Sequence, residues 1–187
     1  GVAVTFSVAS GGGRVTNGFV RTNAQGVATV GSWVLGATAG TQTLTARVEE
    51  SGVTNNPVLF TATATAGPAA IVSAASATTQ SARVGTAVGT PPSVKVTDAG
   101  GNPVAGAQVT FSITSGNGTV APQAAATNAQ GLATVTSWTL GPVAGTQQLT
   151  ATVTGLTPVV FSATATAGSA SQMSAAAGNN QRAQTTR

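Results

Sequence analysis

Short stretches in which every second residue is apolar recur along the chain. Residues 2–8 and residues 107–113 follow this pattern, with Thr and Ser at many of the intervening positions. Successive side chains of a β-strand point to opposite faces, so a period of two predicts strands with one buried and one solvent-facing side. The alternation returns over residues 44–48, 58–64 and 149–153. The pattern therefore predicts an all-β fold of short antiparallel strands.

The sequence contains two copies of one repeat. Residues 1–48 align without a gap with residues 106–153, and roughly three-fifths of the aligned positions are identical. After an insertion near residues 49–56, residues 62–67 match residues 163–168. The repeat unit is therefore about 100 residues long, which is the size of a small β-sandwich.

The repeat divides the chain into three expected segments. Residues 1–67 are a repeat that lacks its first strands, because nothing in them matches the segment that opens the second copy. Residues 68–168 are a complete repeat. Residues 169–187 begin a third, as residues 174–176 match the start of the second copy. We expect further copies on both sides.

Turn-forming residues separate the predicted strands. Residues 98–103, with the sequence Asp-Ala-Gly-Gly-Asn-Pro, follow a predicted strand at residues 93–97 and predict a reversal of the chain. Glycines within residues 11–13 and 116–118 can adopt the positive φ that closes a hairpin. These signals are spaced as short antiparallel strands require.

Six aromatic residues at equivalent positions of the two copies are the candidate core. A large ring supplies buried area that the neighbouring alanines cannot. The six are Phe6, Trp33 and Phe60 in the first copy and Phe111, Trp138 and Phe161 in the second. The apolar phase breaks before Trp33, which predicts a bulge or a bend in the strand. The two Trp rings could instead stack on a sugar, but their recurrence at equivalent positions favours the core.

Composition and charge narrow the possible functions. Only 5% of the residues are charged, and the seven basic residues behind the net charge of +4 are scattered, so nucleic acid is not an expected partner. The chain has no Cys and no His, which excludes disulfides, zinc sites of the usual kinds and Ser-His or Cys-His nucleophiles within it. No stretch approaches the ~20 apolar residues of a membrane helix. We expect no cofactor, no metal and no membrane insertion.

The three acidic residues do not suggest catalysis. Glu49 and Glu50 are neighbours in the insertion of the first copy, and adjacent strand residues point to opposite faces, so we expect a solvated loop. Asp98 stands beside glycines, where a carboxylate accepts backbone hydrogen bonds in a turn. Residues 11–13 lack the following helix that a phosphate-binding loop needs. We therefore expect that the chain is not an enzyme.

Several motifs lie in the second copy. They are Pro-Ser-Val-Lys-Val-Thr-Asp at residues 92–98, Gly-Asn-Pro-Val-Ala-Gly at 101–106, Val-Thr-Phe at 109–111, Thr-Asn-Ala-Gln-Gly at 127–131, and Ala-Gly followed by Leu-Thr-Ala within 144–151. Together they resemble the bacterial immunoglobulin-like repeats of the invasin and intimin type. The resemblance implies tandem Greek-key β-sandwiches, end to end, on an exported or outer-surface bacterial protein. Related repeats often hold calcium with clustered acids, which this chain lacks.

Three functions fit these observations. The first is an extracellular spacer or stalk that extends a terminal binding region from the cell. In it, residues 66–72, with Pro68 and a buried Ile71, limit bending between stiff repeats. The second is a filament subunit in which a neighbour's strand completes the open first repeat. The third is an adhesive domain whose end loops bind a host or matrix glycan or protein. The expected partners are neighbouring repeats of the same chain or other copies of it.

Overall fold

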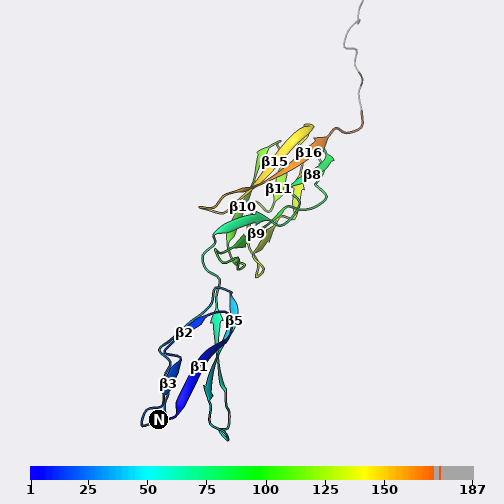
Figure 1. The fold of residues 1–187 in the computed structure, drawn as a ribbon. Helices are drawn as coiled ribbons and strands as arrows, with labels where there is room; N and C mark the ends of the chain where they lie inside the picture. The colour runs from blue at the N-terminus through cyan, green and yellow to red at the C-terminus, as the bar shows by residue number, and fades with distance from the viewer. Residues whose placement is uncertain (171–172, 174–187) are drawn as a thin grey trace, which may run out of the picture.

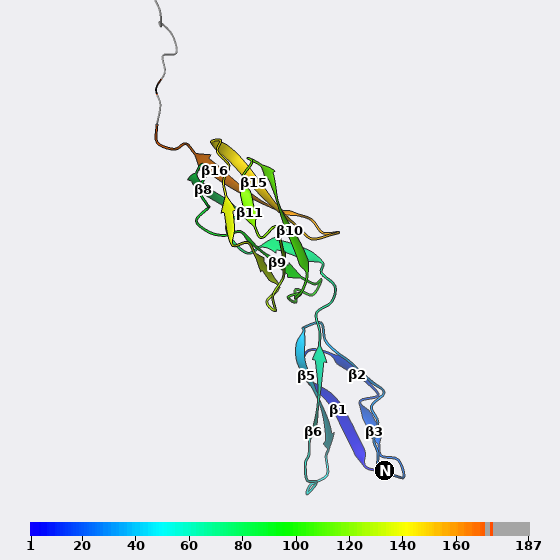
Figure 2. The ribbon, with the colours of Figure 1, turned by 180° about the vertical axis from the view of Figure 1, so that it is seen from behind.

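The computed structural model describes residues 1–170 and Met173. Figures 1 and 2 show two lobes placed end to end, joined by a single crossing of the chain. The described residues form strands and loops and no helix, which confirms the predicted all-β fold. The third repeat expected at residues 169–187 lies outside the described residues except at Ser169, Ala170 and Met173.

The first lobe is a four-stranded sheet with a small two-stranded sheet beside it. The larger sheet has the order β3-β1-β5-β6, and β2 pairs with β4 in the smaller one; all pairs are antiparallel. The strands are β1 (Ala3–Ser10), β2 (Arg14–Thr16), β3 (Phe19–Arg21), β4 (Ser32–Val34), β5 (Gly40–Val48) and β6 (Val58–Ala64).

The second lobe has the equivalents of these strands and four more. The orders are β12-β10-β15-β16-β8, β13-β9-β7 and β11-β14, with the β8–β16 pair parallel. The strands are β7 (Ile71–Ala74), β8 (Thr79–Arg83), β9 (Ser93–Thr97), β10 (Gln108–Ser115), β11 (Thr119–Ala121), β12 (Ala124–Ala126), β13 (Leu132–Thr134), β14 (Ser137–Thr139), β15 (Gly145–Thr152) and β16 (Val159–Thr166).

The predicted break in apolar phase is a change of sheet. In the second lobe β13 pairs with β9, whereas β14, which follows it closely, pairs with β11 in another sheet. Residues 27–29 of the first lobe have nearly the sequence of β13 but form no strand. The reason is that the first lobe has no equivalent of β9 to pair with them. The existence of a strand here depends on its partner more than on its own residues.

The two lobes bury their apolar residues to very different extents. In the second, one buried cluster draws residues from all three sheets and includes Phe111, Trp138 and Phe161, each 1% exposed. In the first, only Val4, Phe6 and Leu44 form the buried cluster, and Trp33 is packed against it while only partly buried. The second lobe is a closed sandwich, and the first is an open one.

Phe60 does not lie in a core, contrary to the sequence-based expectation. Phe60 is 44% exposed, although its ring packs against that of Phe6 with the ring centroids 6.3 Å apart. Its counterpart Phe161 is covered because β8 pairs alongside β16 and because Val94 and Val96 of β9 belong to the same buried cluster. The first lobe has no equivalent of β8 or β9, so one side of β6 stays open.

This difference predicts unequal costs for the same truncation. Phe161→Ala should lower the unfolding free energy of the second lobe by ~3–5 kcal/mol, because it opens a cavity in a closed core. Phe60→Ala, the matched control, should cost the first lobe only about 1 kcal/mol, because its ring is already half solvated. Each lobe has one Trp, so urea unfolding can be followed by fluorescence. Trp33→Phe leaves Trp138 as the reporter for the second lobe, and Trp138→Phe leaves Trp33 as the reporter for the first. Equal losses would contradict the assignment of a closed and an open core.

Candidate functional site at the junction between the repeats

The connection between the lobes is short and is held at both ends. The chain leaves β6 at Ala64 and enters β7 at Ile71. Before β7 begins, the Ala70 N–H donates to the Thr97 carbonyl at the end of β9, at 2.8 Å. β7 then pairs antiparallel with β9. The linker is therefore fixed to the second lobe as soon as it reaches it.

A tight turn follows β9 and faces this linker. The Asp98 carboxylate oxygen Oδ1 accepts hydrogen bonds from the Gly100 N–H at 2.9 Å and the Asn102 N–H at 2.8 Å. The Asp98 N–H donates to the Asn102 carbonyl at 2.9 Å, which closes the loop. Gly101 takes a φ of +83° at the point of reversal. The predicted turn, with Asp98 as its acceptor, is confirmed.

The same two side chains also reach across the junction. Asn102 Nδ2 donates to the Ala37 carbonyl at 2.8 Å, and Asn102 Oδ1 accepts from the Ala39 N–H at 2.9 Å. Both partners belong to the loop that precedes β5 in the first lobe. Asp98 Oδ2 accepts from the Gly67 N–H in the linker at 2.8 Å. One turn therefore binds both the first lobe and the segment that connects it.

Asp98 and Asn102 are buried, so their polar atoms need hydrogen-bond partners within the protein. They are 7% and 9% exposed, and Asn102 Nδ2 donates to Asp98 Oδ2 at 2.9 Å. The bond from Asn102, followed by the one from Gly67, lowers the pKa of Asp98 from 3.8 to about 2, although desolvation opposes the shift. The carboxylate stays ionised although no cationic side chain of residues 1–170 pairs with it, because N–H groups stabilise its charge.

A buried glutamine holds the loop that receives Asn102. Gln42 Oε1 accepts from the Gly36 N–H at 2.7 Å, and Gln42 Nε2 donates to the Thr38 carbonyl at 2.8 Å and the Gly36 carbonyl at 3.1 Å. These bonds satisfy backbone groups that belong to no strand. The receiving loop is consequently preorganised before the second lobe contacts it.

The Gln42 side chain leaves room for nothing larger than glycine at residue 11. Gly11 has a φ of +94°, and a Cβ there would collide with the Gln42 side chain. The second lobe repeats the arrangement with Gln147 and Gly116, whose φ is +102°. The glycine predicted to close this turn is therefore also required by a buried neighbour.

An open hollow of about 610 Å³ lies beside the hydrogen-bonded junction. Its volume falls within the range of small-molecule pockets. Its walls come from both lobes, and none of the side chains that line it is charged. They are Thr38, Ala39, Gly40, Ala64, Thr65, Ala66, Gly101, Asn102, Pro103, Val104, Ala105 and Ala129. Such walls offer few groups that would orient a polar ligand.

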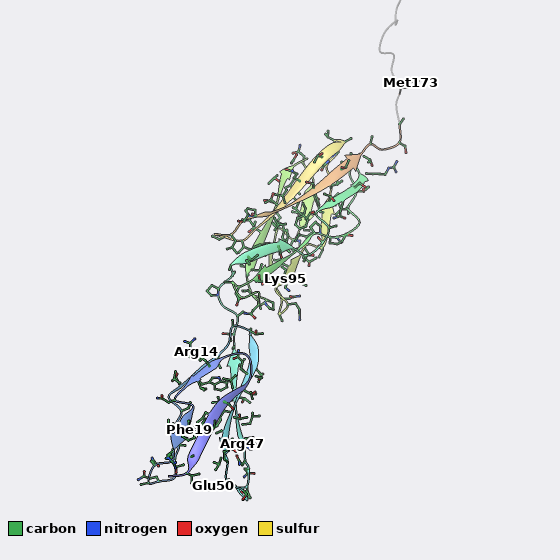
Figure 3. All side chains as sticks on the ribbon, viewed as in Figure 1. Arg14, Phe19, Arg47, Glu50, Lys95 and Met173 are labelled. Atoms are coloured by element: carbon green, nitrogen blue, oxygen red, sulfur yellow. The ribbon has the colours of Figure 1, made fainter. Side chains whose placement is uncertain are left out.

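Within residues 1–170, the side chains of Arg14, Arg47 and Lys95 make no hydrogen bond to the turn at Asp98–Asn102. Figure 3 shows Arg14 and Arg47 on the first lobe and Lys95 on the second, well apart. Arg47 Nε lies 3.5 Å from Glu49 Oε1 in an exposed ion pair. Trp138 is covered on both faces and cannot stack on a sugar, whereas Trp33 lines a groove of about 340 Å³ beside Phe60.

The described part of the chain has neither clustered metal ligands nor a membrane-spanning helix. Across residues 1–170 and Met173, no three or more His, Cys, Asp or Glu side chains gather where they could hold a metal ion. None of these residues forms a helix long and apolar enough to span a membrane.

Sequence reasoning missed the role of Asn102 and Gln42. Asn102 was seen only as a turn residue, because the turn occurs once in the chain and offers no second copy for comparison. Gln42 did carry a signal, since Gln147 stands at the same position of the second copy and both are in phase with the apolar residues of their strands. A recurring glutamine inside an apolar alternation is such a signal, because burial of a polar side chain requires dedicated partners.

Comparison with known proteins supports the fold. No protein-family model and no curated protein matches the chain. Among solved structures, InvD of Yersinia pseudotuberculosis is 19% identical with a TM-score of 0.58, over 95% of this chain and 50% of that one. The D0-D1 domain of intimin is 26% identical with a TM-score of 0.36, over 86% and 80%. The Escherichia coli adhesin FdeC is 21% identical with a TM-score of 0.43, over 87% and 54%.

The likeness to InvD confirms the expected fold class and the expected resemblance. The chain has the immunoglobulin-like fold of bacterial repeats of the invasin and intimin type. It spans half the length of the InvD chain, so the likeness covers only part of that protein.

The buried carboxylate predicts a pH dependence with a definite sign. The folded-state pKa of Asp98, about 2, lies below its ordinary value of 3.8. The contribution of ionised Asp98 to the stability of the folded state is therefore complete above about pH 4, and it is lost as the pH falls towards about 2. Between these values the melting temperature should fall more steeply for the natural chain than for Asp98→Asn, which keeps Glu49 and Glu50 and loses only the Asp98 carboxylate. Calorimetric melts that run parallel in the two proteins would contradict the role of Asp98.

Proposed function

We propose that the chain is a spacer of a bacterial extracellular or cell-surface protein, in which each repeat is a stiff unit and the junction sets the direction of the next. The observation that carries this proposal is the pair of hydrogen bonds by which the Asn102 side chain donates to the Ala37 carbonyl and accepts from the Ala39 N–H. A flexible tether would need no such contact. A spacer benefits from such a contact, because repeats with fixed junctions stay aligned and the length of the spacer then grows with the number of repeats.

The linker supports the same proposal. Pro68 restricts the backbone, Gly67 is bound by Asp98, and Ala70 is bound by Thr97. Ile71 was expected to stiffen the linker by being buried, but it is 52% exposed. Its contribution comes instead from the backbone pairing of β7 with β9. Short, paired connections of this kind resist hinging more than Gly/Ser tracts do.

A surface location and an adhesin-like role belong to the proposal as well. They rest on the motifs of the second repeat and on the fold that it shares with InvD. In that setting the repeats would extend a terminal binding region away from the cell.

The first test removes the crossing side chain. Asn102→Ala should free the two lobes to reorient, because two hydrogen bonds that each contribute roughly 0.5–1.5 kcal/mol are lost. Residual dipolar couplings should report one common alignment in the natural chain and two separate ones in the variant. Exchange of the Ala39 amide should accelerate by about two- to tenfold.

Asn23→Ala is the matched control for this test. The Asn23 side chain also caps a turn, accepting from the Gln25 and Val27 N–H groups, but it does so in the first lobe and makes no contact with the second. The control should keep the common alignment. A natural chain that scatters X-rays as a compact, folded-back pair would overturn the spacer proposal.

A second candidate function is assembly by strand exchange, and the open side of β6 favours it. Val58 and Phe60, on the same face of β6, are 47% and 44% exposed, and among the described residues β6 pairs with β5 alone. Exposed strand edges of this kind recruit further strands. In the second lobe β8 and β9 cover the equivalent face, which favours a segment of the same kind as the occupant. We infer that a segment with the pattern of residues 68–105 from another copy would close the first repeat.

A peptide with the sequence of residues 68–105 tests this candidate. Added to the full chain, it should slow amide exchange along β6 and raise the melting temperature of the first lobe, by filling its open groove. The control peptide carries Val94→Ser and Val96→Ser, which removes two side chains that are fully buried in the second lobe. If both peptides act alike, or neither acts, strand exchange is the wrong function.

A further inference from the structure

The groups that receive the turn at the junction recur at the far end of the second lobe. By the repeat alignment, Ala37 corresponds to Pro142, Ala39 to Ala144 and Gly67 to Gly168. The contacts at the junction use only backbone atoms of the first-lobe residues. The replacement of Ala37 by Pro142 therefore leaves the accepting carbonyl in place.

The far-end loop is built in the same way as the junction loop. Gln147 Oε1 accepts from the Gly141 N–H at 2.7 Å, as Gln42 does from Gly36. Gln147 Nε2 donates to the Val143 carbonyl at 2.9 Å, as Gln42 does to Thr38 at 2.8 Å. In both loops, one buried glutamine therefore fixes the backbone on either side of the residue whose carbonyl faces outwards, Ala37 in the first lobe and Pro142 in the second.

The two loops differ in whether another part of the described chain contacts them. Ala39 is partly buried against the second lobe, whereas Ala144 is exposed and Val143 is 68% exposed. Within the described residues, the Pro142 carbonyl and the N–H groups of Ala144 and Gly168 have no hydrogen-bond partner. A preorganised loop with two free donors and one free acceptor is a docking surface of defined polarity.

We propose that the loop at residues 142–144, together with Gly168, binds an Asp-x-x-Gly-Asn turn of a repeat that follows directly in the chain. This inference rests on the proposed spacer function and names the partner of each junction. The carboxamide of the Asn donates to Pro142 and accepts from Ala144, and the carboxylate of the Asp accepts from Gly168. The turn at residues 98–102 is the form of this partner that the chain itself contains.

The chemistry of the surface selects for asparagine at the last position of the turn. Only a primary amide presents a donor and an acceptor side by side to a carbonyl and an N–H. An Asp in its place would set a carboxylate oxygen against the Pro142 carbonyl and leave both unpaired. A repeat without this Asn would therefore join the chain but not align with it.

The experiment uses the full chain with residues 68–168 repeated directly after Gly168. The readout is amide exchange at Ala144, with Ala39 as the internal standard because its junction is intact in every protein compared. In the extended chain the exchange of Ala144 should slow by about threefold or more relative to the original chain. In a second version, Asn102→Asp is made in the added copy alone, and Ala144 should exchange as in the original chain.

The outcomes separate this inference from the proposed function. Protected amides of Leu149 and Phe161 in the added copy establish that it has folded in both versions. If Ala144 then exchanges freely in both while Ala39 stays protected, the docking surface is refuted and the spacer proposal stands. Protection of Ala144 in both versions also refutes it, because docking would then not depend on the Asn. An unprotected Ala39 would count against the spacer proposal itself.

Discussion

The relative placement of the two sandwiches depends on hydrogen bonds between the Asp98–Asn102 turn and partly buried backbone groups of the first lobe and the linker. Loops at the ends of a sandwich leave the strand ladder, so their N–H and C=O groups are free to bind side chains or solvent. From inside the first lobe, Gln42 pairs with Gly36 and Thr38. From the second lobe, Asn102 pairs with the next groups of the same loop, at Ala37 and Ala39. Folding of a lobe and docking of its neighbour are thus two parts of one satisfied network.

The sequence alone allowed the repeat, the all-β fold and the turn at residues 98–103 to be predicted, because each is recorded in local pattern or in internal similarity. The exposure of Phe60 was not predictable in this way. Phe60 and Phe161 have the same residue type and nearly the same neighbours in sequence, and only the strands that cover them differ. Residues 27–29 and β13 make the same point for secondary structure, since two segments that differ only by Val and Leu form a strand only where β9 is present.

The candidate site was harder to predict than the fold for a physical reason. Its recognition groups on the first lobe are backbone atoms, which every residue type provides, so the sequence of the loop carries no mark of them. The side chains on the other partner, Asp98 and Asn102, have an adequate explanation within their own turn. Only their second set of bonds, which depends on the relative position of two lobes, reveals the junction.

The way in which Asp98 is stabilised has a consequence for the environments that the molecule tolerates. The crossing bonds of Asn102 join uncharged groups, and the Asp98 carboxylate is surrounded by N–H groups; across residues 1–170 no ion pair takes part in the junction. Dissolved salt weakens attractions between separated charges over ~8–10 Å, but it has little effect on short dipolar contacts between buried atoms. The alignment of the repeats should therefore be nearly indifferent to ionic strength, from fresh water to brine.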